Sequence, residues 1–243
     1  MNSRQRERYH RNILLNQIGE DGQERLLNSS VLVVGAGGLG SPVALYLAAA
    51  GVGTIGIMDD DTVDISNLQR QLLHSTPDIG RPKVESARES IQALNPDITV
   101  NTYRTRLTSE NAGNILPQYQ FVIDATDNFA SKFLIAEVCH HHKRAYSHAG
   151  IMEFNGQTMT VIPGKTACCR CLFRDQPPEL ETVAGVLGVL PGVIGSIQAA
   201  EALKYLLACG ELLTNRLLIY DALKTGFREI ALQRDPACPL CGE

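Results

Sequence analysis

The sequence predicts an α/β fold with a doubly wound, mainly parallel sheet that is extended by antiparallel strands. Up to residue 143, short apolar segments alternate with segments of helical length, which is typical of parallel strands joined by helices. One apolar segment runs directly into closely spaced glycines, in VLVVGAGGLGS (31–41). Beyond residue 144 the chain changes to short strand-type segments joined by turns, which indicates a mixed or antiparallel extension.

The expected elements follow in chain order. Residues 1–29 form a helical segment with an apolar stripe of Leu14, Leu15, Leu26 and Leu27. Strands are expected at 31–34, 54–58, 100–103 and 121–124, with helices at about 38–50, 82–94 and 128–143. The later strands are 145–150, 156–162, 216–221 and 226–232, with a helix around 196–209 packed between them.

The uncharged stretch 182–200 is long enough to raise the question of a membrane helix. Four glycines dilute its apolar character, and Pro191 would interrupt a helix in its middle. We interpret it as a buried loop that leads into a helix. The 243 residues then form one domain, with a nucleotide-binding half at 30–150 and a mixed-strand half at 151–243.

Composition excludes several classes of function. The net charge of −4 gives no general attraction to nucleic acid, and 5% aromatic residues without tryptophan offer little surface for stacking bases. The first residues, MNSRQRERYHRN, lack the apolar core of a secretory signal. With 7 cysteines and no such signal, we expect a reducing, cytoplasmic environment in which thiols bind metal or react.

The glycine spacing has a mechanical meaning. Gly35 permits a tight turn, Gly37 lets the backbone approach a phosphate, and Gly40 lets the next helix pack against the strand. Asp59 ends the second strand, where such Rossmann-like motifs place an acceptor for a ribose hydroxyl. This motif predicts a bound nucleotide and, taken alone, favours NAD.

Several polar side chains beyond the second strand change that interpretation. They are Ser66, Asn67, Arg70, Lys83, Asp127 and Asn128. Each has a simpler explanation: Arg70 as a solvated charge, Lys83 as a neighbour of Glu85, and Asp127 as a helix N-cap. Taken together, two cations and a carboxylate around one phosphate site fit a triphosphate with Mg²⁺ better than a dinucleotide.

Two CxxC pairs lie far apart in the chain, Cys168 with Cys171 and Cys238 with Cys241. Zinc prefers four tetrahedral ligands, and four thiolates leave no open position, so the pattern predicts a structural zinc site. Cys169 is a bystander in this interpretation.

We assign no catalytic or metal-binding role to the histidines. CHHHKR (139–144) places cationic side chains at the end of a helix, where they complement the helix dipole. His74 and His148 are solitary and are assigned to packing or to the surface.

The ordered set of motifs resembles the ThiF/MoeB/HesA family, bacterial relatives of ubiquitin-activating enzymes that adenylate ubiquitin-like sulfur carriers. The motifs are RYHRN, GAGGLGS, IMDDDTVDISNLQRQ, GRPKVESA, DATDNF, CxRC and CPLC, and they span nearly the whole chain. The resemblance implies an adenylyltransferase that uses ATP and Mg²⁺ on a carrier protein ending in Gly-Gly. It leaves open whether the pathway makes thiamine, molybdopterin or another product.

The resemblance also implies the roles of individual residues. Gly38 would lie near the phosphates and Asp59 on the ribose, and Asp127 would bind or position the metal. Ser66, Asn67, Arg70 and Lys83 would line the nucleotide. A homodimer is implied, in which Arg11 reaches into the neighbouring active site.

One position departs from the family pattern. Many relatives carry a cysteine in a C-x-x-A/G-G motif that forms a thioester or sulfur link with the carrier, and Glu181 stands at that place in ETVAG (181–185). We therefore expect adenylation without a covalent intermediate there, and the parts of Cys139, Cys169 and Cys209 in sulfur transfer stay open. The alternatives are an NAD-dependent oxidoreductase, for which no hydride-site acid stands out, and a non-catalytic zinc-bearing scaffold.

Overall fold

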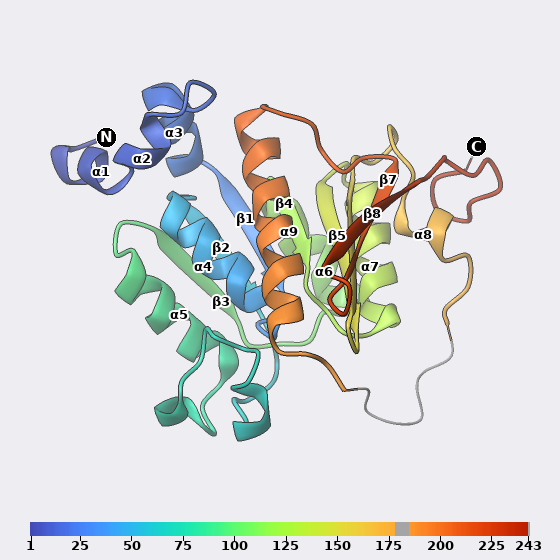
Figure 1. Ribbon diagram of the computed structural model, residues 1–243, viewed down its shortest axis with the longest axis horizontal. Helices are drawn as coiled ribbons and strands as arrows, with labels where there is room; N and C mark the ends of the chain where they lie inside the picture. The colour runs from blue at the N-terminus through green and yellow to red at the C-terminus, as the bar shows by residue number, and fades with distance from the viewer. Residues whose placement is uncertain (178–184, 243) are drawn as a thin grey trace.

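The computed structural model describes residues 1–177 and 185–242, which include an eight-stranded sheet of order β3-β2-β1-β4-β5-β6-β7-β8 (Figure 1). Five strands are parallel: β1 (Ser30–Val34), β2 (Thr54–Met58), β3 (Thr99–Tyr103), β4 (Phe121–Asp124) and β5 (Ala145–Met152). Three more add antiparallel pairing: β6 (Asn155–Val161), β7 (Arg216–Asp221) and β8 (Gly226–Ala231). The predicted α/β class with a mainly parallel sheet is confirmed.

The direction of winding reverses between β1 and β4. From β1 the chain builds outward to β2 and β3, and then returns to place β4 on the other side of β1. Val34 is in register with Met58 on β2 and with Asp124 on β4, so the three strands end level. Ligands of open α/β sheets bind in the crevice at such a switch point, beyond the carboxyl ends of the strands.

Helices cover both faces of the sheet (Figure 1). Helices α4 (Gly40–Ala50), α5 (Lys83–Leu94) and α9 (Val189–Leu207) pack on one face, and α6 (Ser109–Ile115) and α7 (Phe129–His141) on the other. Three short helices open the chain, α1 (Ser3–Arg8), α2 (His10–Ile13) and α3 (Gly19–Leu27), and α8 (Cys169–Leu172) follows β6.

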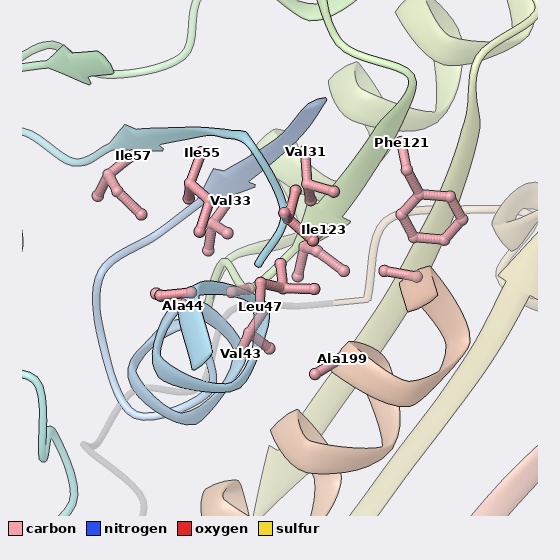
Figure 2. Close-up of a cluster of buried hydrophobic side chains, with 14 of the residues drawn as sticks. Val31, Val33, Val43, Ala44, Leu47, Ile55, Ile57, Phe121, Ile123 and Ala199 are labelled. Carbon is pink, nitrogen blue, oxygen red and sulfur yellow. The ribbon is translucent and has the colours of Figure 1, made fainter. Parts of the chain in front are cut away.

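Successive side chains along each strand point to opposite faces of the sheet, so the same strands contribute to both layers of the core. Val31 and Val33 point to the face covered by α4, where they meet Leu47 among other side chains (Figure 2). Leu32 and Val34 point to the opposite layer, which is covered by α6 and α7. Strands buried on both faces explain why the first strand reads as a continuous apolar run.

Some expectations need correction. Strand β5 pairs parallel with β4, so the parallel part of the sheet extends one strand further than the pattern indicated. Helix α9 packs against α4 and one face of the sheet rather than between strands. It begins at Val189, because Pro191 in the first turn has no helical N–H bond to lose.

The N-terminal apolar stripe was predicted only in part, and two helices, α6 and α8, were not predicted. Leu26 is buried, whereas Leu14 and Leu15 are 59% and 52% exposed. Helix α6 was not expected, because its sequence SENAGNI has little apolar periodicity. Among the described helices, none has the length and apolar character to cross a bilayer.

Candidate active site

The glycine loop after β1 lies against the end of β4, at the switch point of the sheet. Gly35 has a φ of 101°, and a Cβ there would stand 2.6 Å from the carbonyl oxygen of Ala125. A Cβ on Gly40 would collide with the carbonyl of Gly35. Only glycine fits either position, so the loop can turn tightly and the start of α4 can approach the strand.

Asp59 fastens this loop to the end of β2. One carboxylate oxygen accepts the N–H of Ala36 at 2.8 Å, and the other accepts the N–H of Asp61 at 2.9 Å. Each oxygen keeps a second lone pair. The carboxylate is therefore fixed beside the loop with acceptor capacity for a hydroxyl group.

The segment after β2 lies over the glycine loop. The Cδ of Arg70 is 3.5 Å from where a Cβ of Gly38 would stand, and its guanidinium donates to the carbonyl of Ser66 at 3.0 Å. Asn67 accepts the N–H of Asp64 at 3.3 Å, in a capping box. The structure thus places Arg70 at the loop, with Ser66 and Asn67 in the same short turn.

Lys83 is buried at the N-terminal end of α5, where a cation opposes the helix dipole. Its ammonium donates to Asp61 at 2.9 Å, and the side chains of Lys83 and Asp61 are 6% and 67% exposed. The lysine is held by a carboxylate that water reaches easily. This geometry argues against Lys83 as a solvated neighbour of Glu85.

The β4 side of the crevice carries the second predicted acid. Asn128, rather than Asp127, is the N-cap of α7, since its side-chain oxygen accepts the N–H of Ser131 at 2.9 Å. Asp127 is exposed, and its carboxylate accepts from the Asn128 amide at 3.3 Å. The N-cap explanation therefore does not apply to Asp127.

Arg11 is not brought to this crevice within one chain. It lies on α2, which precedes α3 and the amino end of β1, whereas the glycine loop follows the carboxyl end of β1 (Figure 1). Tyr9 anchors the segment, because its buried ring hydroxyl accepts from Asn95 at 2.8 Å.

His74, which the sequence assigned to packing or the surface, is buried and joins two parts of the site. Its Nε2–H donates to the carbonyl of Ala36 at 3.0 Å, and its Nδ1 accepts from the hydroxyl of Ser86 at 2.9 Å. Burial lowers the pKa of His74, which favours this neutral tautomer. The imidazole thereby links the glycine loop to the helix that carries Lys83.

A buried charge network lies behind the turn that carries Asp127. The ammonium of Lys132 donates to Asp124 at 3.2 Å, to the carbonyl of Thr126 at 2.7 Å and to that of Ala149 at 2.6 Å. His148 donates from Nδ1 to Asp124 at 2.8 Å. Sequence reasoning missed this network; the one signal was an acid, Asp124, that ends an apolar strand.

The charges in this network balance. Burial would raise the pKa of Asp124, but the ammonium of Lys132 and the hydrogen bond from His148 outweigh it and lower the pKa to about 2. Burial also lowers the pKa of His148, so the ring is neutral beside an ion pair. Its Nε2 has no hydrogen-bond partner in the part of the chain that the structure describes.

The four predicted cysteines converge at the C-terminal end. Their sulfurs lie within 4.8 Å of one another, with Cys168 3.9 Å from Cys171 and 3.6 Å from Cys238, and Cys171 3.3 Å from Cys241. Tetrahedral zinc with bonds of about 2.3 Å sets sulfurs about 3.8 Å apart. The cluster therefore has the donors and spacing of a metal site.

The other cysteines lie outside this cluster. Cys139 and Cys169 are buried, and burial raises the pKa of both thiols, that of Cys169 to about 12. They are thus protonated and shielded, whereas Cys209 is half-buried. Glu181 falls outside the described residues.

The family model described as "ThiF family" matches residues 9–240. The chain belongs to the ThiF family. A sulfur carrier protein adenylyltransferase of Thermus thermophilus is 47% identical over 98% of this chain and 91% of its own length. A SAMP-activating enzyme E1 of Haloferax volcanii is 45% identical over 100% of this chain and 91% of its own.

Solved structures agree on the fold. A crystal structure of Escherichia coli MccB with MccA-N7isoASN superposes with a TM-score of 0.87 at 22% identity, covering 98% of this chain and 75% of that one. Membership of the ThiF family favours adenylation over the NAD-dependent alternative.

Proposed function

We propose that this protein adenylates the C-terminal glycine carboxylate of a ubiquitin-like sulfur-carrier protein with ATP. The observation that carries the proposal is the 47% identity, over nearly the full length, to a sulfur carrier protein adenylyltransferase. The site is consistent with it, because Arg70 lies against Gly38 of the glycine loop and Lys83 pairs with Asp61, close in sequence to the Asp59 carboxylate that holds the loop.

In the proposed reaction a carboxylate oxygen of the carrier attacks the α-phosphorus of ATP. A new P–O bond forms, the bond to the bridging oxygen breaks, and pyrophosphate leaves with the electron pair, giving an acyl adenylate. The nucleophile is already ionised at neutral pH, so no general base is needed. The enzyme must hold two anions together and stabilise the negative charge that develops.

Each residue then has a role. Arg70 and Lys83 neutralise phosphate charge, Asp59 accepts from the ribose, and Gly37 and Gly38 leave room for the phosphates. Ser66 and Asn67 line the nucleotide beside Arg70. Asp127 offers an exposed carboxylate of the kind that Mg²⁺ prefers, with Asn128 beside it at the start of α7, and bound Mg²⁺ would offset triphosphate charge.

We propose that the enzyme works as a homodimer, with Arg11 completing the neighbouring crevice. Arg11 is exposed, and its helix α2 lies away from the carboxyl end of β1 in the same chain (Figure 1). Leu14 and Leu15, in the same segment, are large apolar side chains left exposed on a single chain. Burial against a second copy would remove both from water.

The carrier is proposed to end in Gly-Gly, as the family resemblance implies, and to serve a thiamine- or molybdopterin-type pathway. With Glu181 in place of the family cysteine, we propose that no thioester or sulfur link forms at that position. The shielded thiols of Cys139 and Cys169 fit this proposal.

The cysteine cluster is proposed to hold structural zinc that joins the C-terminal end to α8. Cys238→Ser should release zinc, measured by mass spectrometry of the metal, and lower the thermal unfolding temperature. Cys209→Ser, which changes a half-buried thiol outside the cluster, should retain the metal. Full zinc content in Cys238→Ser would contradict this assignment.

Carrier-dependent exchange of pyrophosphate into ATP tests the function. Lys83→Ala and Asp127→Ala should each reduce exchange by about 100-fold or more, because transition-state charge is left unstabilised. Gel filtration should show both variants folded and in the wild-type assembly. Near-normal exchange in both would refute the site, and nicotinamide binding without exchange would refute the function.

A further inference from the structure

The side chain of Gln71 is buried beside the glycine loop without a complete set of partners. Gln71 is 4% exposed, and its Oε1 has no hydrogen-bond partner in the part of the chain that the structure describes. Its Nε2 faces the loop: a Cβ built on Gly37 would lie 3.7 Å from it. Nor does any described residue accept a hydrogen bond from Nε2, and because buried amides are nearly always paired, this free donor requires an explanation.

Hydrogen bonds hold the main chain of Gln71 in place. The N–H of Gln71 donates to the carbonyl of Asn67 at 3.0 Å, and the N–H of His74 donates to the carbonyl of Gln71 at 3.0 Å. The imidazole of His74 fastens the same turn to Ala36 at 3.0 Å. The main chain of Gln71 is therefore held beside the loop and its side chain is buried there before any ligand arrives, which lowers the entropy cost of a new contact.

Consecutive side chains match consecutive glycines at this point. Arg70 lies against Gly38, and Gln71 against Gly37. Because Gly37 contributes no side chain, none stands between its main chain and the Gln71 amide. Arg70 supplies positive charge. An amide N–H adds geometric selectivity, because a neutral donor must point at its acceptor.

We propose that Gln71 is a further substrate-binding residue, whose Nε2–H donates to a phosphate oxygen of the nucleotide. The inference rests on the proposed function, since it requires ATP at the glycine loop. It assigns Gln71 to orienting the phosphate chain, in addition to the cations that neutralise it.

The test compares Gln71→Met, which removes the donor, with Gln71→Glu, which keeps the shape and adds a negative charge. The probe is α,β-methylene-ATP with Mg²⁺, titrated calorimetrically into the whole protein. Gln71→Met should raise the Kd about tenfold, the size expected for losing a hydrogen bond to a charged group, and Gln71→Glu should raise it further. Gln118→Glu adds the same charge at an exposed position before β4 and should leave the Kd within twofold.

Thermal unfolding separates binding from structure. Since Oε1 has no partner to lose, Gln71→Met should not lower the unfolding temperature of the free protein, while the increase caused by the analogue should shrink. The inference is overturned if both Gln71 variants bind the analogue within twofold of wild type. It is equally overturned if the free protein is destabilised and the nucleotide-induced increase is unchanged. Failure of the wild type to bind the analogue would instead overturn the proposed function and this inference together.

Discussion

The strands on either side of β1 each end beside an aspartate and a lysine, but only one of these pairs is open to solvent. Next to β2, Lys83 pairs with Asp61, whose side chain is 67% exposed. At the end of β4, Lys132 pairs with Asp124, which is fully buried and also accepts from His148. The Asp61 carboxylate can exchange the Lys83 ammonium for water at little cost in free energy. The ammonium can therefore exchange Asp61 for a phosphate. The Lys132 ammonium already donates to a carboxylate and to main-chain carbonyls, so it stabilises the structure around the crevice.

The same substitution at the two lysines should therefore have very different effects on stability. Lys132→Met leaves the Asp124 carboxylate buried without its cation and should lower the free energy of unfolding by about 3–5 kcal/mol. Lys83→Met leaves a carboxylate that is already in water and should cost less than about 1 kcal/mol. Urea unfolding of both variants measures the difference.

Lys224→Met is the matched control, because Lys224 is exposed on the turn between β7 and β8. It should stay within about 0.5 kcal/mol of wild type. Equal losses at Lys83 and Lys132 would mean that both pairs belong to the framework, and the contrast between the two sides would disappear.

The residues on the β2 side of the crevice could be singled out from the sequence, because they lie in a few short motifs. The spacing of Gly35 and Gly40 fixes a turn, and Asp59 stands at the end of the next apolar strand. Lys83 follows a proline that marks the start of a helix. The cysteine cluster was equally visible, since each CxxC pair is a local motif and zinc chemistry requires four donors.

The β4 side could not be predicted in the same way. Lys132 meets Asp124 across a helix–strand contact, and His148 reaches the same carboxylate from a neighbouring strand. The contact of His148 depends on the parallel pairing of β5 with β4, which strand-type patterns do not specify. His74 and Gln71 were missed for a related reason: their significance lies in what faces them across the loop.

A neutral histidine is buried on each side of the crevice, so protonation in acid should lower the free energy of unfolding through both sides. Burial holds the pKa of His74 and of His148 below the unfolded value of about 6.5. Unfolding then takes up protons, and stability that is complete above pH 6.5 is lost as the pH falls toward the folded pKa values. Between pH 7.5 and 5.5 we expect the free energy of unfolding to fall by about 1–2 kcal/mol.

Urea titrations across this range measure the loss, and His74→Gln divides it between the two sides. Glutamine cannot take up a proton, so the variant should retain about half of the pH dependence, from His148. An unchanged dependence in His74→Gln would assign the whole effect to the β4 side and would leave the glycine-loop side insensitive to acid.

The smallest effect is expected at the exposed partner of Lys83. Asp61→Asn removes a carboxylate that competes with phosphate for the ammonium, so the Kd for α,β-methylene-ATP should fall about two- to fivefold while stability changes by less than about 1 kcal/mol. Asp60→Asn removes the same charge from an exposed neighbour and should produce a smaller decrease, which salt screens out. A higher Kd in Asp61→Asn would show that this carboxylate helps to bind the nucleotide rather than competing with it, and the exchangeable pair would then be as fixed as the one behind β4.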